Sequence, residues 1–425
     1  MIKMFCATYL YVTSVFIPGF FNCRLLGTPS TFRLQLPIIG FILLAWLPAH
    51  AADFNFPNNL PSNCSGSNSN YTCGALALGA GDTITIAPGV VATVTINGNF
   101  TTGAGSKINS GGSAASLNFL VNGITTIGAD STLNANISSV GTGSVINIGD
   151  RNTVVGILKT ENAAINVGDY TRITGSLLTT VTGVITIGAY STVSGNLNTY
   201  TGAINVGANS TTGSLISVSA GAITTGANSV VNGKISTGAG AVSTGANSKV
   251  TGSVTTSVGA ITIGAGGTVG GKVNNLDTST AGAVTVGDGG IITGTILTGA
   301  GAVTLGASAQ SAGIATQDGA ITVGTLSNVK GSLCTGNSGA ITVGASSKVA
   351  GNVITKTAGA ITIGASADVA GAVKAKGAGD VSIGAGATVG ATENSSQCAD
   401  VVVAEAAPQV PPTIKSREWR QLFMR

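Results

Sequence analysis

The chain has 425 residues, of which 64 are glycine, while only 8% are charged and 4% aromatic, and its formal net charge is +4. Glycine without a triplet period excludes collagen, and regular isoleucine and valine exclude a disordered linker. Because the positive and negative charges nearly balance, the sequence lacks the excess of basic residues that is typical of nucleic-acid-binding proteins.

Residues 1–51 have the features of a secretory signal. They contain basic but no acidic residues, and the apolar run Leu34–Leu47 ends in Pro48-Ala49-His50-Ala51. The run of about 14 residues is shorter than the roughly 20 that a spanning helix needs, and its end fits the small-residue rule for cleavage before Ala52. We predict that the mature protein is secreted, periplasmic or at the cell surface. An uncleaved N-terminal anchor is the alternative.

Four cysteines remain after residue 51: Cys64, Cys73, Cys334 and Cys398. An even number in an exported chain predicts disulfides. Cys64–Cys73 would close a short polar loop in an N-terminal cap, residues 52–79. Cys334–Cys398 would tie the last repeats to the tail, unless these two cysteines are buried free thiols.

A short pattern then recurs along most of the chain. Its best copies read Gly-Ala-Ile-Thr-Val/Ile-Gly-Ala-Ser, as at residues 339–346 and 359–366. The second glycine of each copy serves as a marker, and the mean interval between markers is about 19.7 residues, which is typical of a solenoid. The fourteen markers are Gly128, Gly149, Gly168, Gly188, Gly207, Gly226, Gly245, Gly264, Gly287, Gly306, Gly324, Gly344, Gly364 and Gly384.

Within one unit, alternation of apolar and polar residues predicts short strands. In residues 183–199 it predicts two strands, with Ile185, Ile187, Val193 and Leu197 pointing inward. A second glycine seven residues after most markers, such as Gly195, is placed by the same alternation on the inward side of the second strand. We expect a parallel β-solenoid over residues 80–390, with about 16 turns spaced about 4.8 Å apart.

The sequence lacks the residues of common catalytic and metal sites. The single histidine is His50, inside the predicted signal, and the acidic residues are scattered singly. We therefore expect no enzyme activity, cofactor, metal or small-molecule substrate. Asp150 and Asp169 fit a weak cation site or, alternatively, solvated corners. A polysaccharide-active β-helix is the remaining enzymatic alternative.

One outward column is regular and uncharged. It lies between two inward isoleucine or valine residues in each unit, and its neighbours are mostly alanine or glycine. We interpret it either as a solvated strand with ladder hydrogen bonds and β-propensity or as a binding face, for ice, a mineral or another solenoid. The column contains Asn147, Asn166, Thr186, Asn205, Thr224, Ser243, Thr262, Thr285, Thr304, Thr322, Thr342, Thr362 and Ser382.

The tail, residues 391–425, combines a predicted cap, a proline-rich linker and a basic end. Residues 406–412 predict a stiff linker. Trp419, Leu422 and Phe423 fall on one face of a helix, which favours docking to a partner or a membrane surface. A frayed terminus is the alternative.

The repeat resembles the bactofilin-type polymer-forming β-helix in Ile341, Val343, Gly344, Val349, Gly351 and Val353. The resemblance implies a right-handed solenoid that assembles end to end without nucleotide. Cys64, Cys73 and the segment Gly81-Asp82-Thr83-Ile84-Thr85 are also similar to exported β-rich proteins of MSHA-type pilus systems.

Together these features favour an exported, non-enzymatic structural solenoid that self-associates or attaches to the cell surface, with a surface component or pilus system as a candidate partner. The alternative is a binding module, ice-binding or adhesin-like, that uses the threonine-rich face. Because a solenoid has unpaired backbone groups at both ends, we expect the capped mature protein to be mostly monomeric or weakly associating. We expect residues 80–390 alone to form filaments or aggregates.

Overall fold

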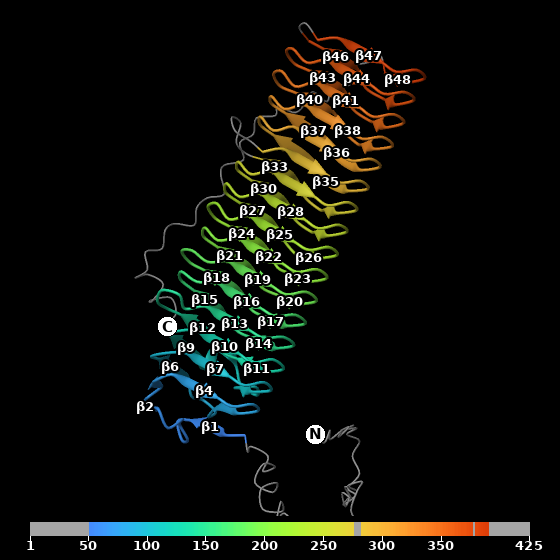
Figure 1. Cartoon of the computed structure of the whole chain (residues 1–425). Helices are drawn as coiled ribbons and strands as arrows, with labels where there is room; N and C mark the ends of the chain where they lie inside the picture. The colour runs from blue at the N-terminus through green and yellow to red at the C-terminus, as the bar shows by residue number, and fades with distance from the viewer. Residues whose placement is uncertain (1–50, 276–281, 377–378, 391–425) are drawn as a thin grey trace, which may run out of the picture. The chain divides into compact units, whose positions relative to one another are not determined.

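The computed structural model describes residues 51–275, 282–376 and 379–390. The signal predicted for residues 1–51 lies outside this part except for Ala51. Cys398 and the predicted docking residues Trp419, Leu422 and Phe423 also lie outside it. The described chain is an all-β parallel solenoid of about 16 turns, as expected from the repeat (Figure 1).

Most repeats contain three strands rather than the two expected from alternation. In the unit of Gly188 these are β19 (Ile185–Ile187), β20 (Thr192–Val193) and β21 (Leu197–Thr199). The expected second strand is broken at Gly195, where the chain bends. The single break adds a third wall to the coil, and equivalent strands stack into three columns.

The first column forms a separate 16-stranded sheet, in which every strand pairs in parallel with the strand of the neighbouring turn. Its strands are β4 (Leu76–Leu78), β7 (Phe100–Thr102), β10 (Thr125–Ile127), β13 (Ile146–Ile148), β16 (Ile165–Val167), β19, β22 (Ile204–Val206), β25 (Ile223–Thr225), β28 (Val242–Thr244), β31 (Ile261–Ile263), β34 (Val284–Val286), β36 (Val303–Leu305), β38 (Ile321–Val323), β41 (Ile341–Val343), β44 (Ile361–Ile363) and β47 (Val381–Ile383).

The second and third columns form one 32-stranded sheet, joined by the two long strands that run through both. The second column contains β1 (Asp53–Phe56), β5 (Thr83–Ile86), β8 (Lys107–Ile108), β11 (Thr132–Asn134), β14 (Thr153–Val155), β17 (Arg172–Thr174), β20, β23 (Thr211–Thr212), β26 (Val230–Val231), β29 (Lys249–Val250), β32 (Thr268–Val269), β35 (Ile291–Thr298), β37 (Gln310–Thr316), β39 (Asn328–Val329), β42 (Lys348–Val349), β45 (Asp368–Val369) and β48 (Thr388–Val389).

The third column contains β2 (Cys64–Ser67), β3 (Asn70–Cys73), β6 (Ala92–Ile96), β9 (Leu117–Val121), β12 (Asn136–Ser139), β15 (Leu158–Thr160), β18 (Leu177–Thr179), β21, β24 (Leu215–Ser217), β27 (Ile235–Thr237), β30 (Val254–Thr256), β33 (Val273–Asn275), the ends of β35 and β37, β40 (Leu333–Thr335), β43 (Val353–Thr355) and β46 (Val373–Ala375). A short 3-10 helix, η1 (Ala114–Ser116), precedes β9.

The core is a set of apolar ladders that run through the turns. Ile185, Ile187, Val193 and Leu197 are all buried, as the alternation predicts. Their partners in the preceding turn are again isoleucine, valine or leucine, because the register pairs equivalent positions. Branched side chains stacked in this way suit a parallel sheet that is buried on its inner face.

A polar ladder lies inside one corner of the coil. The residue two positions after most markers has a left-handed backbone, as at Asn209 with a φ of 57°. The next residue is buried: Ser191 Oγ donates to the Gly168 carbonyl at 3.0 Å and accepts from the Thr171 N–H at 3.1 Å. The corner therefore satisfies its own buried backbone groups from turn to turn.

The second glycine of each unit has a different role from the one expected. It does not point into the core from within a strand; it lies at the bend between the second and third columns. A Cβ on Gly195 would lie 2.3 Å from the Gly175 carbonyl oxygen, and one on Gly351 would lie 2.6 Å from the Gly331 carbonyl carbon. Glycine is therefore required because neighbouring turns approach backbone to backbone.

The segment expected as the N-terminal cap, residues 52–79, contributes strands to the stack. Strand β1 pairs in parallel with β5, and β4 pairs with β7. Strands β2 and β3 form an antiparallel hairpin in which Cys64 lies opposite Cys73, and the two form the expected disulfide.

Candidate functional site

The outward column of the 16-stranded sheet, which we call the threonine column, is continuous in register. Thr322 pairs with Thr342 and Thr342 with Thr362, and the same pairing links every expected member from Asn147 to Ser382. Most of these side chains are exposed, while the residues on either side of each, except those beside Ser382, are buried. The structure thus brings the nine predicted face residues into one line: Thr186, Asn205, Thr224, Thr262, Thr285, Thr304, Thr322, Thr342 and Thr362.

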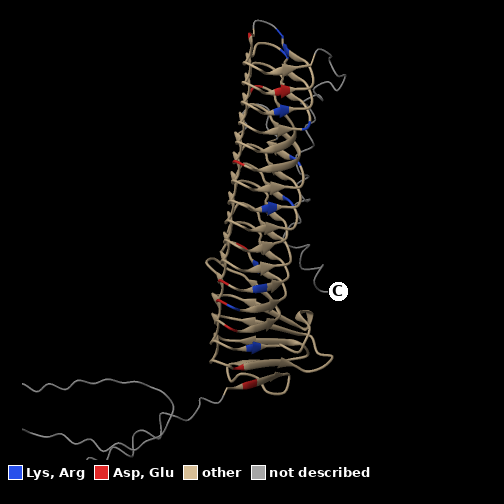
Figure 2. Cartoon of the chain, turned by 90° about the vertical axis from the view of Figure 1, so that its right-hand side faces the viewer, with Lys and Arg blue, Asp and Glu red and all other residues tan. Residues whose placement is uncertain are grey.

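The surroundings of the threonine column are small and uncharged. From β22 to β44 the outward residue before each strand is alanine, and the one after it is the marker glycine. Figure 2 shows that lysine, arginine, aspartate and glutamate lie instead on the strand column facing the viewer and along the corners beside it. The 16-stranded sheet therefore presents a flat face with one hydroxyl or amide per turn, about 4.8 Å apart.

The hydroxyl groups of this face are available to solvent or a ligand. Between Thr186 and Ser382, no side chain of the column has a hydrogen bond to another protein group in the described residues. Nearer the N-terminus, Asn166 donates to Asn147 at 2.9 Å. Side-chain ladder bonds, one of the two interpretations of the column, thus occur only at that amide pair.

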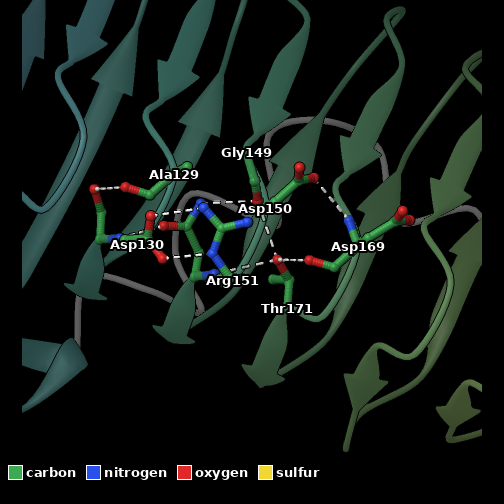
Figure 3. Close-up of polar contacts among 9 residues, drawn as sticks. Ala129, Asp130, Gly149, Asp150, Arg151, Asp169 and Thr171 are labelled. Atoms are coloured by element: carbon green, nitrogen blue, oxygen red, sulfur yellow. Dashed lines mark hydrogen bonds and ion pairs between the residues drawn. The ribbon is translucent and has the colours of Figure 1, made fainter. Parts of the chain in front are cut away.

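A second polar cluster lies on the corners that follow β10, β13 and β16 (Figure 3). Arg151 donates from Nε and Nη2 to the two carboxylate oxygens of Asp130, at 2.7 and 2.8 Å. Asp150 Oδ1 accepts the N–H of Asp169 at 2.9 Å, and Asp169 Oδ1 accepts the N–H of Ala189 at 2.7 Å. These aspartates satisfy backbone donors of the next turn, which favours the corner interpretation over a cation site.

The ion pair changes the titration of both groups. The hydrogen bonds from Arg151 lower the pKa of Asp130, and those to Asp130 raise the pKa of Arg151. Both side chains are exposed, so the pair is screened by water and salt. It fixes the orientation of the corner and has no buried partner of the kind that tunes a catalytic acid.

Two tyrosines continue the same corner. Tyr170 and Tyr190 stack with ring centroids 4.9 Å apart and planes 2° apart, and both are exposed. Both also have a positive φ, which is uncommon for a bulky residue. Each ring covers one face of the other, so the stacking itself leaves the second face of each exposed ring for other contacts.

The C-terminal end of the stack differs from every other turn. Val381 and Ile383 on β47 occupy inward positions but are 43% and 52% exposed, whereas Ile361 and Ile363 one turn earlier are 0% and 1% exposed. Strands β46, β47 and β48 each pair with one neighbour only among the described residues. We call this the open end.

The N-terminal end is covered by contrast. Phe56 on β1 and Tyr71 on β3 pack against each other within the first turn and are buried. Asn55 and Asn59 exchange two backbone hydrogen bonds, so the chain folds back against the edge of β1. The two ends of the solenoid are therefore chemically different.

We also searched the described residues for metal sites, membrane-spanning helices and reactive cysteines. In the described ranges no three residues of the types histidine, cysteine, aspartate and glutamate are grouped closely enough to hold a metal ion. No helix within those ranges has the length and apolar character to cross a membrane. Cys334 is buried on β40, and its predicted bond to Cys398 stays a prediction because Cys398 lies outside the described residues.

Sequence reasoning missed the buried polar corner and the open end. The corner has a visible signal, since a serine three residues after the marker recurs at Ser191, Ser210, Ser229 and Ser248. The open end has none, because Val381 and Ile383 look like any other inward pair. Comparison of the chain with family models, with curated proteins and with solved structures gave no match.

Proposed function

We propose that this protein is an exported, non-enzymatic structural solenoid that associates in pairs through its open end. The observation that carries the proposal is the exposure of Val381 and Ile383, which are inward residues that no further turn covers within residues 51–390 as described. Exposed apolar side chains beside unpaired strand edges favour contact with another chain. The resemblance to end-to-end assembling β-helices is in keeping with this.

The difference between the ends favours pairs rather than filaments. A filament needs one open end to meet a second, different open end, whereas a two-fold pair needs only one self-complementary surface. Since the first turn is covered by Phe56 and Tyr71, the open end is the surface left for contact.

The association is expected to be weak. Each of the two side chains is about half exposed, so burying it gains roughly 1–1.5 kcal/mol. Four such side chains in a pair gain about 4–6 kcal/mol, which is comparable to the lower part of the 4–15 kcal/mol that association costs. Strand-edge hydrogen bonds must supply the remainder, so pairing should depend on concentration.

Analytical ultracentrifugation of the mature chain over a range of concentrations tests this. We expect a monomer–dimer equilibrium that Ile383→Lys abolishes and Ser382→Lys leaves intact. Ser382 is the matched control because it is exposed on the same strand but faces the side of the solenoid. A monomer at all concentrations, or equal effects of the two variants, would contradict the proposal.

A second candidate function is binding of an ordered surface, such as ice or a mineral, by the threonine column. Its support is the flat, uncharged, in-register line of hydroxyl groups that have no protein partner. Thermal hysteresis that is lost in Thr262→Lys with Thr285→Lys, but kept in Thr268→Lys on β32, would favour this function. Absence of hysteresis and of surface binding in the unmodified protein would exclude it.

A further inference from the structure

Tyr170 and Tyr190 are the one stacked pair of exposed aromatic rings in the described part of the chain. They occupy the same corner position in consecutive turns, with ring centroids 4.9 Å apart and ring planes 2° apart. The two residues are 59% and 53% exposed, so a small reagent in solution reaches both rings. The other exposed tyrosine among the described residues, Tyr200, is 45% exposed and has no ring partner.

The backbone of the solenoid holds the two rings at this separation. The Tyr170 N–H donates to the Ala189 carbonyl at 3.0 Å, and the Tyr190 N–H donates to the Ala208 carbonyl at 2.9 Å. These bonds tie each corner to the next turn, so the two side chains leave the backbone about 4.8 Å apart. The ring stack is therefore maintained by the repeat itself.

The corner keeps this pair although its backbone disfavours tyrosine. Both residues have a left-handed backbone, with φ of 56° and 57°, which bulky side chains rarely adopt. The same position in the following turns is asparagine, at Asn209, Asn228 and Asn247, and asparagine suits this conformation. Because the rings are exposed, their burial does not offset the strain. A strained aromatic pair on the surface is the kind of outlier from which a function is inferred.

The neighbours of the pair in this corner bond away from it. Arg151, one turn before Tyr170, donates to both carboxylate oxygens of Asp130. Asn209, one turn after Tyr190, accepts a hydrogen bond from the turn that follows it, at 3.2 Å. Neither tyrosine hydroxyl has a hydrogen bond to another described residue. The two phenol groups are therefore free of other polar contacts with the described chain, and each ring faces the other.

We propose that Tyr170 and Tyr190 are a site of oxidative cross-linking, at which a peroxidase and hydrogen peroxide join the two rings into a dityrosine within one chain. The oxidant removes one electron and one proton from each phenol, and hydrogen peroxide is reduced to two molecules of water. The two phenoxyl radicals form one carbon–carbon bond between ring carbons ortho to the oxygens. The hydrogen on each of these carbons then moves to the oxygen of its own ring, which restores both phenols. This modification is independent of pairing through the open end.

The stacked geometry favours formation of this bond. A ring carbon that couples becomes tetrahedral, so the new bond begins perpendicular to the ring plane. Two rings whose planes are 2° apart face each other in that direction, which is the arrangement that a fast intramolecular reaction needs. Exposed side chains change rotamer within nanoseconds, so the rings turn toward the geometry of the linked product after coupling. The link joins two consecutive turns on the outside of the corner.

Oxidation of the mature chain by a peroxidase and hydrogen peroxide tests this, with dityrosine fluorescence as the readout. At about 10 μM protein the neighbouring ring has an effective concentration of at least about 1 mM, so the link should form at least about a hundredfold faster than links between molecules. The yield per chain should therefore stay the same on dilution. Trypsin digestion of the oxidised monomer should release residues 160–172 and 173–234 as one linked pair.

Three variants separate stacking from exposure. Tyr170→Phe and Tyr190→Phe each keep a stacked ring but lack one phenol, and each should abolish the dityrosine fluorescence of the monomer. Tyr200→Phe is the matched control, because it removes an exposed tyrosine outside the stack, and it should leave the fluorescence unchanged. Three results would overturn the proposal: fluorescence that requires Tyr200, a yield per chain that falls in proportion to dilution, or no fluorescence while free tyrosine couples under the same conditions.

Discussion

Phe56 and Tyr71 pack edge to face at the first turn, with ring centroids 4.9 Å apart and planes at 84°. Both are buried, so the N-terminal end of the solenoid has its own apolar closure. No comparable pair covers Val381 and Ile383 among the described residues. The assembly of the protein should follow from this difference.

Removal of the first turn should change the assembly from pairs to longer species. A truncated chain of residues 80–390 exposes apolar side chains and strand edges at both ends, so we expect filaments or aggregates. Light scattering should detect these larger species. The control is a chain of residues 52–390, which keeps the closed end and is measured at the same concentration. A truncated chain no larger than the control would contradict the prediction.

Gly351→Ala and Gly351→Leu should both destabilise the solenoid. A Cβ at this position meets Ser332 Oγ at 2.4 Å and the Gly331 carbonyl carbon at 2.6 Å, so the neighbouring turns must separate. We expect a cost of about 1–3 kcal/mol. Thr342→Ser, on the exposed face, should stay within about 0.5 kcal/mol. Thermal unfolding distinguishes them, and equal effects would show that the turns are not in close contact at this bend.

Ser191→Ala should lower the free energy of unfolding, although it removes only one small hydroxyl group. The change leaves the Gly168 carbonyl and the Thr171 N–H without their partner inside the corner. Leaving buried polar groups unpaired costs about 1–3 kcal/mol. Denaturant unfolding provides the measurement, and Thr186→Ala, which removes a hydroxyl without a protein partner, is the control that should change little.

The Asp130–Arg151 pair should make a pH-dependent contribution. Because the pKa of Asp130 is lowered in the folded protein, its stabilisation is present above the unfolded value of about 3.9 and is lost as the pH falls through the folded value. Asp130→Asn should therefore lower the unfolding temperature at pH 7 and have no effect in strong acid. Asparagine suits the φ of 58° at this position. A difference that persists in acid would assign the effect to something other than the charge.

The mature protein should begin at Ala52. The apolar run that ends in Ala49-His50-Ala51 predicts cleavage there. N-terminal sequencing of exported material checks this. Material that retains residues 1–51 would instead support the uncleaved anchor.

The sequence by itself determined the repeat, the number of turns and the inward ladders. A period of about 20 residues can bury its apolar face only against its own copies, and alternation then selects which residues point inward. Ile185, Ile187, Val193 and Leu197 could therefore be assigned without coordinates. The alignment of the threonine column could be predicted for the same reason, since residues at the same distance from their markers occupy equivalent positions in successive turns.

The tertiary structure alone decided where the coil bends, how its ends are closed and which outward residues are covered. The sequence pattern assigns Gly195 and Gly351 to inward strand positions. The structure places them at a bend, where the neighbouring turn lies against them. Val381 repeats the pattern of Ile361 but has no next turn over it in the described part of the chain, and Cys334 repeats the outward parity of Thr342 but is buried. Local pattern fixes the direction of a side chain relative to its own strand, whereas burial depends on what the rest of the chain places above it.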